Sequence, residues 1–163
     1  MEHEGGCRIA GIGAPPCMRQ RRAMRLVWSC LRKRREYAES DGKTAFMIAV
    51  CNGHTDCIKL LLKKEAGMQD EDGRTALMGA AEHDHIECVK LLIEKEVGMQ
   101  SKNGWTALML ATYNNKLECA KLLAEREKDI KSTHGWGGFP PGTTALAIAK
   151  RWGHTAIASI LSG

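Results

Sequence analysis

The chain has 163 residues, which is enough for one ordinary core or for a short array of small units. Its formal net charge of +5 lies entirely in residues 1–40, which contain nine Arg or Lys and four Asp or Glu, whereas residues 41–163 contain fifteen of each. This balance excludes a general electrostatic attraction of residues 41–163 to nucleic acid.

The sequence predicts a reducing, intracellular location. The start, "MEHEGGC", lacks the basic-then-apolar pattern of a signal peptide, and there is no run of about 18 apolar residues. Of the seven cysteines, Cys57, Cys88 and Cys119 recur at one constant interval, each just before an apolar run. A fixed place in a repeat indicates a packing role rather than a disulfide framework. We therefore expect the cytoplasm, with the nucleus as the alternative.

Residues 1–40 divide into two segments. Residues 1–20 include "GIGAPPC" without periodicity, which predicts a disordered head. Residues 21–40 contain most of the basic run "RQRRAMRLVWSCLRKRR" at 19–35, whose apolar residues recur at helical spacing. Two interpretations stay open. In the first, the run is a capping helix that forms half of an incomplete N-terminal repeat. In the second, the basic residues 19–35 bind nucleic acid or an anionic membrane, or act as a targeting address.

Residues 41–134 contain the same segment three times at a constant interval. Thr44, Thr75 and Thr106 each stand in a Gly-X-Thr-Ala-(Phe/Leu)-Met motif. An apolar stripe, a polar breaker and a second apolar stripe follow, the latter being Cys57, Ile58 and Leu60 to Leu62 in the first copy. Each copy predicts a short helix capped by Thr, a tight turn, a second helix and a polar loop. Such short helices are unstable alone, so the copies at 41–71, 72–102 and 103–134 are expected to stack.

A fourth copy, "GTTALAIA" around Thr144, begins later than the interval between Thr75 and Thr106 predicts. The extra length predicts an inserted loop at 135–141 and a partial C-terminal repeat at 142–163. The loop carries Trp136 and Phe139 among Gly and Pro residues. Exposed aromatic side chains on a loop favour recognition of a partner. The alternative is that the loop forms a lid over the junction to the last repeat.

The segment "DGRTALMGAAEHDHIECVKLLIEKEVGMQ" resembles an ankyrin repeat in its Gly-Arg-Thr-Ala-Leu start, its Ala-Ala and Leu-Leu pairs and the final "VGMQ". The resemblance covers residues 41–163. It implies an all-α ankyrin-repeat solenoid of stacked helix-turn-helix units with short β-turn fingers. The Met-rich style also resembles large protist ankyrin arrays, which occur alone or attached to protein kinases. Ala replaces the usual Pro after Thr, and units shorter than the usual length of about 33 residues predict shorter fingers.

The ankyrin resemblance implies that the concave face binds another protein. This face is lined by the finger residue before each Thr and by the end of each first helix. These positions differ between the copies, while the Leu-Leu positions hardly change. We predict a monomeric, non-catalytic scaffold or adaptor whose partner contacts Lys43, Asn52, Arg74, His83, Trp105, Tyr113, Asn114, Trp136, Phe139 and Trp152. Trp105 and Tyr113 would form the contact centre. The alternative is that Trp105 only packs on a neighbouring finger.

The sequence predicts no catalytic, cofactor or metal site. His83, His85 and Cys88 lie close together in the chain, but His85 fills the turn position and Cys88 the packing position of the repeat. The segment "GIGAPP" lacks the last glycine of a dinucleotide-binding fingerprint, and no phosphate loop or kinase motif is present. Catalysis would require a domain elsewhere in a longer parent chain.

Overall fold

The computed structural model describes residues 42–163, so the segments 1–20 and 21–40 lie outside the described residues. Eight helices span the described part in four pairs. The pairs are α2 (Ala45–Cys51) with α3 (Thr55–Glu65), α4 (Ala76–Glu82) with α5 (Ile86–Glu96), α6 (Ala107–Tyr113) with α7 (Leu117–Glu127), and α8 (Ala145–Trp152) with α9 (Thr155–Ser162).

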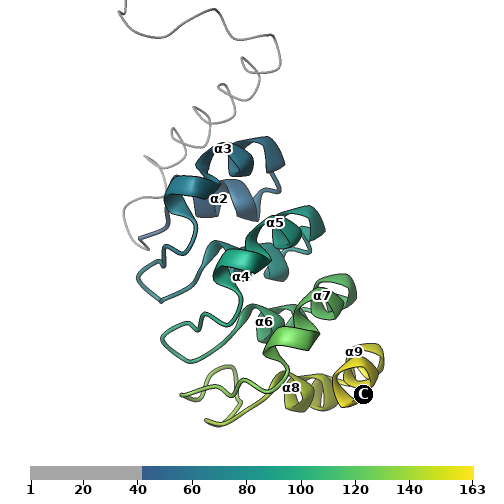
Figure 1. The fold of residues 1–163 in the computed structure, drawn as a ribbon. Coiled ribbons are helices and arrows are strands. Elements are labelled where there is room, and N and C mark those ends of the chain that lie inside the picture. Colours follow the sequence, from purple (N-terminus) through teal and green to yellow (C-terminus); the bar gives the residue numbers. More distant parts are fainter. Residues whose placement is uncertain (1–41) are drawn as a thin grey trace, which may run out of the picture.

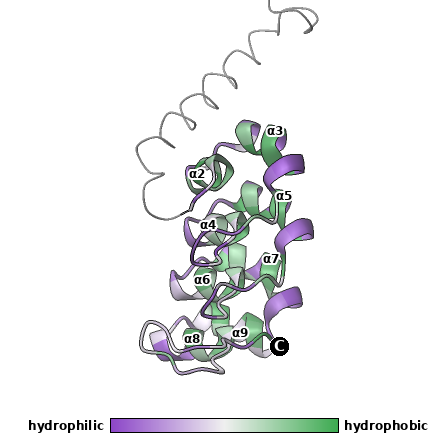
Figure 2. Ribbon diagram, turned by 90° about the vertical axis from the view of Figure 1, so that its left-hand side faces the viewer, coloured by the Kyte–Doolittle hydropathy of each residue, from purple (hydrophilic) through white to green (hydrophobic). Residues whose placement is uncertain are grey.

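The four pairs stack in one row and form two layers of helices (Figure 1). The first helices α2, α4, α6 and α8 pack on one another in one layer, and the second helices α3, α5, α7 and α9 form the other. Figure 2 shows polar residues along the outer side of α3, α5 and α7. The predicted all-α repeat architecture is confirmed for the described residues.

Each first helix begins where the repeated Thr predicts it. The hydroxyl oxygens of Thr44, Thr75, Thr106 and Thr144 accept a hydrogen bond from the backbone N–H three residues later. The glycine two residues before each Thr has a φ between 62° and 82°. Glycine adopts this conformation without the steric strain that a Cβ atom causes. At Gly104 a Cβ atom would lie 2.2 Å from the Thr133 nitrogen, so a neighbouring finger also excludes any side chain there.

The apolar stripes form one continuous core between the two layers. Phe46, Leu77, Leu92 and Leu123 are fully buried, as are the repeated cysteines Cys57, Cys88 and Cys119. The cysteines therefore have the predicted packing role. Burial and a hydrogen bond to the Asp84 carboxylate raise the pKa of the Cys119 thiol to about 12, which keeps this thiol protonated.

Leu60 departs from the predicted stripe, because 57% of this residue is exposed. Neighbouring helical residues point about 100° apart, so Ile58 and Leu60 to Leu62 cannot all face the core. Ile58 is fully buried, and Leu61 and Leu62 are partly buried. The Leu60 side chain therefore points outward from α3.

A buried glutamate at the end of each of the helices α5 and α7 joins neighbouring repeats, a feature that the sequence analysis missed. Glu96 accepts hydrogen bonds from the N–H of Leu77 in its own repeat (2.7 Å) and of Gly67 in the preceding repeat (2.9 Å). Glu127 accepts the corresponding bonds from Leu108 and Gly98, both at 2.8 Å. Burial raises the pKa of the Glu127 carboxyl, although these N–H donors act in the opposite direction.

The fingers that precede the first helices are β-turns joined in a ladder. Gly73 donates its N–H to the Asp70 carbonyl (2.9 Å), and Gly104 donates to the Ser101 carbonyl (2.8 Å). The Gln100 side chain donates to its own finger at Gly104 (2.7 Å) and to the next segment at Lys131 (3.0 Å). These bonds fix the spacing between successive fingers.

We expect Glu96→Ala to lower the free energy of unfolding by about 2 kcal/mol or more, because two buried N–H groups lose their acceptor. Urea denaturation followed by circular dichroism measures this loss. The matched control is Glu94→Ala on the same helix, which removes an exposed ion pair with Arg126 and should cost less than about 1 kcal/mol. Equal losses in the two variants would contradict the role of Glu96.

Candidate functional site

The predicted site residues of the first two repeats come together in the structure. Lys43, Arg74 and His83 line one pocket of about 180 Å³, with Glu82 at the end of α4. Arg74 comes from the finger and forms an ion pair with Glu82, and about one third of each side chain is exposed. The finger and the helix end are therefore linked by charge across the concave side of this repeat.

The two predicted asparagines stabilise their own helices. The Asn52 side chain donates to the Ile48 carbonyl at 2.7 Å, and Asn114 donates to the Leu110 carbonyl at 3.0 Å. Both residues are the C-caps of first helices, and the same two carbonyls also accept the backbone N–H of these asparagines. Their predicted contact with a partner would use the amide oxygen or the second N–H of the side chain.

The predicted aromatic residues gather around Trp105. Its ring centroid lies 4.7 Å from Trp136, 5.9 Å from Tyr113 and 6.0 Å from Phe139, with the rings steeply inclined to one another. Such edge-to-face arrangements stabilise aromatic pairs. Trp105 is only 3% exposed, and its indole N–H has no hydrogen-bond partner among residues 42–163. Its position therefore matches the alternative in which Trp105 packs on a neighbouring segment.

The insertion lies inside the fourth finger. Ser132 and Gly142 form the same turn bond as Ser101 and Gly104, but with a much longer stretch of chain between them. The insertion folds back on the third finger, where Thr133 and His134 donate to the Asn103 carbonyl at 3.2 and 3.1 Å.

Trp136 and Phe139 form a tight hairpin within the insertion. Each backbone N–H donates to the carbonyl of the other residue, at 3.1 and 3.0 Å. Gly137 and Gly138 at the tip have φ values of 58° and 81°, which a two-residue turn of this kind requires. The Phe139 side chain is buried, whereas Trp136 is 43% exposed. Phe139 thus behaves as a lid residue, and Trp136 remains available for contact.

Arg151 of α8 fixes the hairpin to the last repeat. Its guanidinium donates to the Gly138 carbonyl at 2.6 Å and lies 4.8 Å from the centre of the Phe139 ring. The next residue, Trp152, is 52% exposed and its ring lies 5.7 Å from that of Tyr113. The exposed part of the cluster therefore consists of Trp136 and Trp152, with Tyr113 between them.

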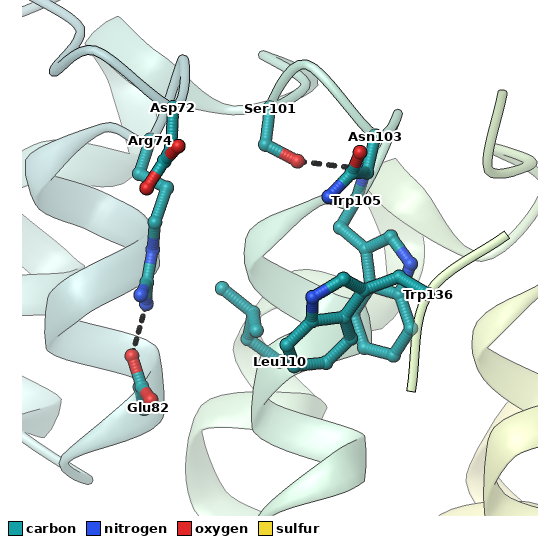
Figure 3. A pocket seen from close by; sticks show the side chains of 8 residues that line it. All are labelled: Asp72, Arg74, Glu82, Ser101, Asn103, Trp105, Leu110 and Trp136. Carbon is teal, nitrogen blue, oxygen red and sulfur yellow. Dashed lines mark hydrogen bonds and ion pairs between the residues drawn. The ribbon is translucent and has the colours of Figure 1, made fainter. Parts of the chain in front are cut away.

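A second pocket, of about 220 Å³, lies between the ion pair of the second repeat and the aromatic cluster. Figure 3 shows Asp72, Arg74 and Glu82 on one side of it and Trp105 with Trp136 on the opposite side. Leu110 lies between the two sides, and Ser101 and Asn103 line the edge at the fingers. The pocket thus has an ionic wall and an aromatic wall.

His85 of the histidine-rich turn and Cys88 of α5 have structural roles. One ring nitrogen of His85 lies 2.8 Å from the Cys51 carbonyl oxygen of the preceding repeat, and Cys88 is buried in the core. Among residues 42–163, no three His, Cys, Asp or Glu side chains are grouped as they would be around a metal ion. Within the same residues, no helix has the length and apolar character needed to span a membrane.

We expect Phe139→Ala to lower the free energy of unfolding by about 3 kcal/mol, because a buried aromatic side chain is lost from the junction of the last two repeats. Trp136→Ala, in the same hairpin, should cost less, about 1 kcal/mol, since 43% of Trp136 is already exposed whereas Phe139 is buried. Urea denaturation of both variants measures the difference. A larger loss for Trp136→Ala would contradict the assignment of Phe139 as the lid residue.

The comparisons agree with this architecture. A family model of ankyrin repeats in three copies matches residues 23–100 and 94–163. No curated protein matches the chain. The matched segments cover most of the chain, and the stacked helix pairs have the geometry that the family implies. The chain therefore belongs to the ankyrin-repeat family.

Proposed function

We propose that the protein is a non-catalytic scaffold or adaptor that captures another protein on its concave surface. Ankyrin repeats in general mediate contacts between proteins. The observation that supports this use here is the position of the exposed aromatics Trp136 and Trp152. They lie beside Tyr113 on a frame that the repeated residues keep rigid. Trp, Tyr and Arg are the residues that dominate binding energy in protein interfaces.

The proposed contact surface consists of the concave residues that differ between repeats. Its accessible members are Lys43, Arg74, His83, Tyr113, Trp136 and Trp152, and Asn52 and Asn114 lie at its edge. Trp105 and Phe139 support it from below, since both are buried. We propose that the monomeric chain acts in the cytoplasm or the nucleus, which is consistent with the finding that the four cysteines among the described residues form no disulfide with one another. The resemblance to protist ankyrin arrays, including those attached to kinases, stays a prediction.

We expect the double variant Trp136→Ala/Trp152→Ala to lose partner capture about tenfold, because both exposed anchors of the interface are removed. Immobilised full-length protein is incubated with an extract of its source cells, and retained proteins are quantified by mass spectrometry. Retention of the same proteins at an unchanged level would contradict the proposed surface.

The matched control is Leu60→Ala/Met68→Ala, which also removes two exposed large hydrophobic side chains. Leu60 lies on α3 and Met68 in the loop that follows it, away from the exposed aromatics of the concave surface. This control should retain the partners at the wild-type level. If it loses them equally, the capture is non-specific hydrophobic adsorption.

A second candidate function rests on the basic run at residues 19–35, which lies outside the described residues. In this alternative a regulatory module binds nucleic acid or an anionic membrane electrostatically. Binding to RNA or to phosphatidylserine vesicles should then fall steeply between about 50 and 200 mM NaCl. It should also fall when Arg21, Arg22, Arg34 and Arg35 are replaced by Gln. Binding that ignores both changes would exclude this alternative.

A further inference from the structure

The pocket with one ionic and one aromatic wall has the size of a side-chain site. Its volume is about 220 Å³, whereas a single water molecule needs only about 10–15 Å³. It lies between the second and third repeats, beside their fingers (Figure 3). A bound segment of a partner on the proposed concave surface would pass here. A long side chain from such a segment would enter between Glu82 and Trp136.

The charges around the pocket favour a cation. Two carboxylates, those of Asp72 and Glu82, and one guanidinium, that of Arg74, line the pocket. Arg74 is already paired with Glu82, while Asp72 takes part in none of the ion pairs among the described residues. An incoming carboxylate would meet two like charges and a cation that is already occupied. An incoming cation would find an unpaired carboxylate and the second oxygen of Glu82.

The aromatic wall favours a flat cation with an apolar stem. Figure 3 shows the Trp136 indole reaching into the pocket toward Leu110 and the Arg74–Glu82 pair. Guanidinium groups stack on indole faces and bind carboxylates through two parallel hydrogen bonds. The three methylene groups of an arginine would cover Leu110 while its head meets the carboxylates.

We propose that this pocket binds an arginine side chain of the partner protein. The proposal rests on the proposed function, because it names the chemistry of one contact within the concave surface. The guanidinium lies against Trp136 and is held by Glu82, while Asp72 adds negative charge at the finger edge of the pocket. The partner is thereby defined as one that presents an exposed arginine on an extended segment.

The test uses small ligands and the full-length protein. The indole N–H signals of the tryptophans are followed by ¹H–¹⁵N NMR during titration with Nα-acetyl-arginine methylamide. Parallel titrations use the uncharged citrulline analogue and the glutamate analogue. We expect the Trp136 signal to shift with the arginine ligand at millimolar concentration, and with neither of the others. A response to citrulline or glutamate as strong as that to arginine would overturn the proposal.

A pair of charge variants tests the ionic wall. Glu82→Gln should weaken the arginine ligand about two- to fivefold, as expected for removal of a partly exposed charge. Glu87→Gln makes the same charge change on the exposed face of α5, next to Lys90, and should leave the affinity unchanged. Equal affinities in the two variants would overturn the assignment of Glu82.

These outcomes are separate from those of the capture experiment. If no arginine ligand binds while Trp136→Ala/Trp152→Ala still loses its partners, the arginine site fails and the proposed function stands. If the arginine ligand binds while capture does not depend on the concave surface, the proposed function fails.

Discussion

The carboxylates of Glu96 and Glu127 are the contacts on which the rest of the array depends. Each carboxylate accepts one hydrogen bond from an N–H near the start of the first helix of the same repeat. It accepts another from an N–H in the loop of the preceding repeat. The direction of a short first helix, which has little stability alone, is thereby fixed relative to its neighbour. Because the first helices follow directly from the fingers, the spacing of the concave side chains is set by the same bonds.

On this frame, differences between repeats become differences along one surface. The second repeat contributes the ion pair Arg74–Glu82, and the third contributes an aromatic cluster centred on Trp105. The two are adjacent because the fingers are tied at a constant interval. Rigid presentation lowers the entropy lost when a partner binds, which suits a scaffold.

The sequence predicted the helix pairs, their Thr caps and the buried cysteines, because each of these follows from a local pattern that recurs once per repeat. Glu65, Glu96 and Glu127 recur at the same interval, yet a glutamate near a helix end ordinarily lies in water. The burial of Glu96 and Glu127 depends on two N–H donors each, one of which comes from the preceding repeat. The sequence left open whether Trp105 is exposed or packs on a neighbouring finger, because its burial requires the insertion to fold back. That fold depends on the Gly137–Gly138 turn and on Arg151 together.

The attachment of Trp136 has a thermodynamic consequence for recognition. This wall of the pocket belongs to the fourth finger and is fixed through Arg151 to α8, while the opposite wall belongs to the second repeat. In a linear array each repeat contacts only its neighbours, so a helix pair can detach locally while the rest stays folded. Whenever α8 and α9 detach, the pocket loses Trp136 from its aromatic wall although its other residues stay folded. The affinity for a guest would thus include the docking equilibrium of the α8–α9 pair, and the guest would in turn suppress this local opening.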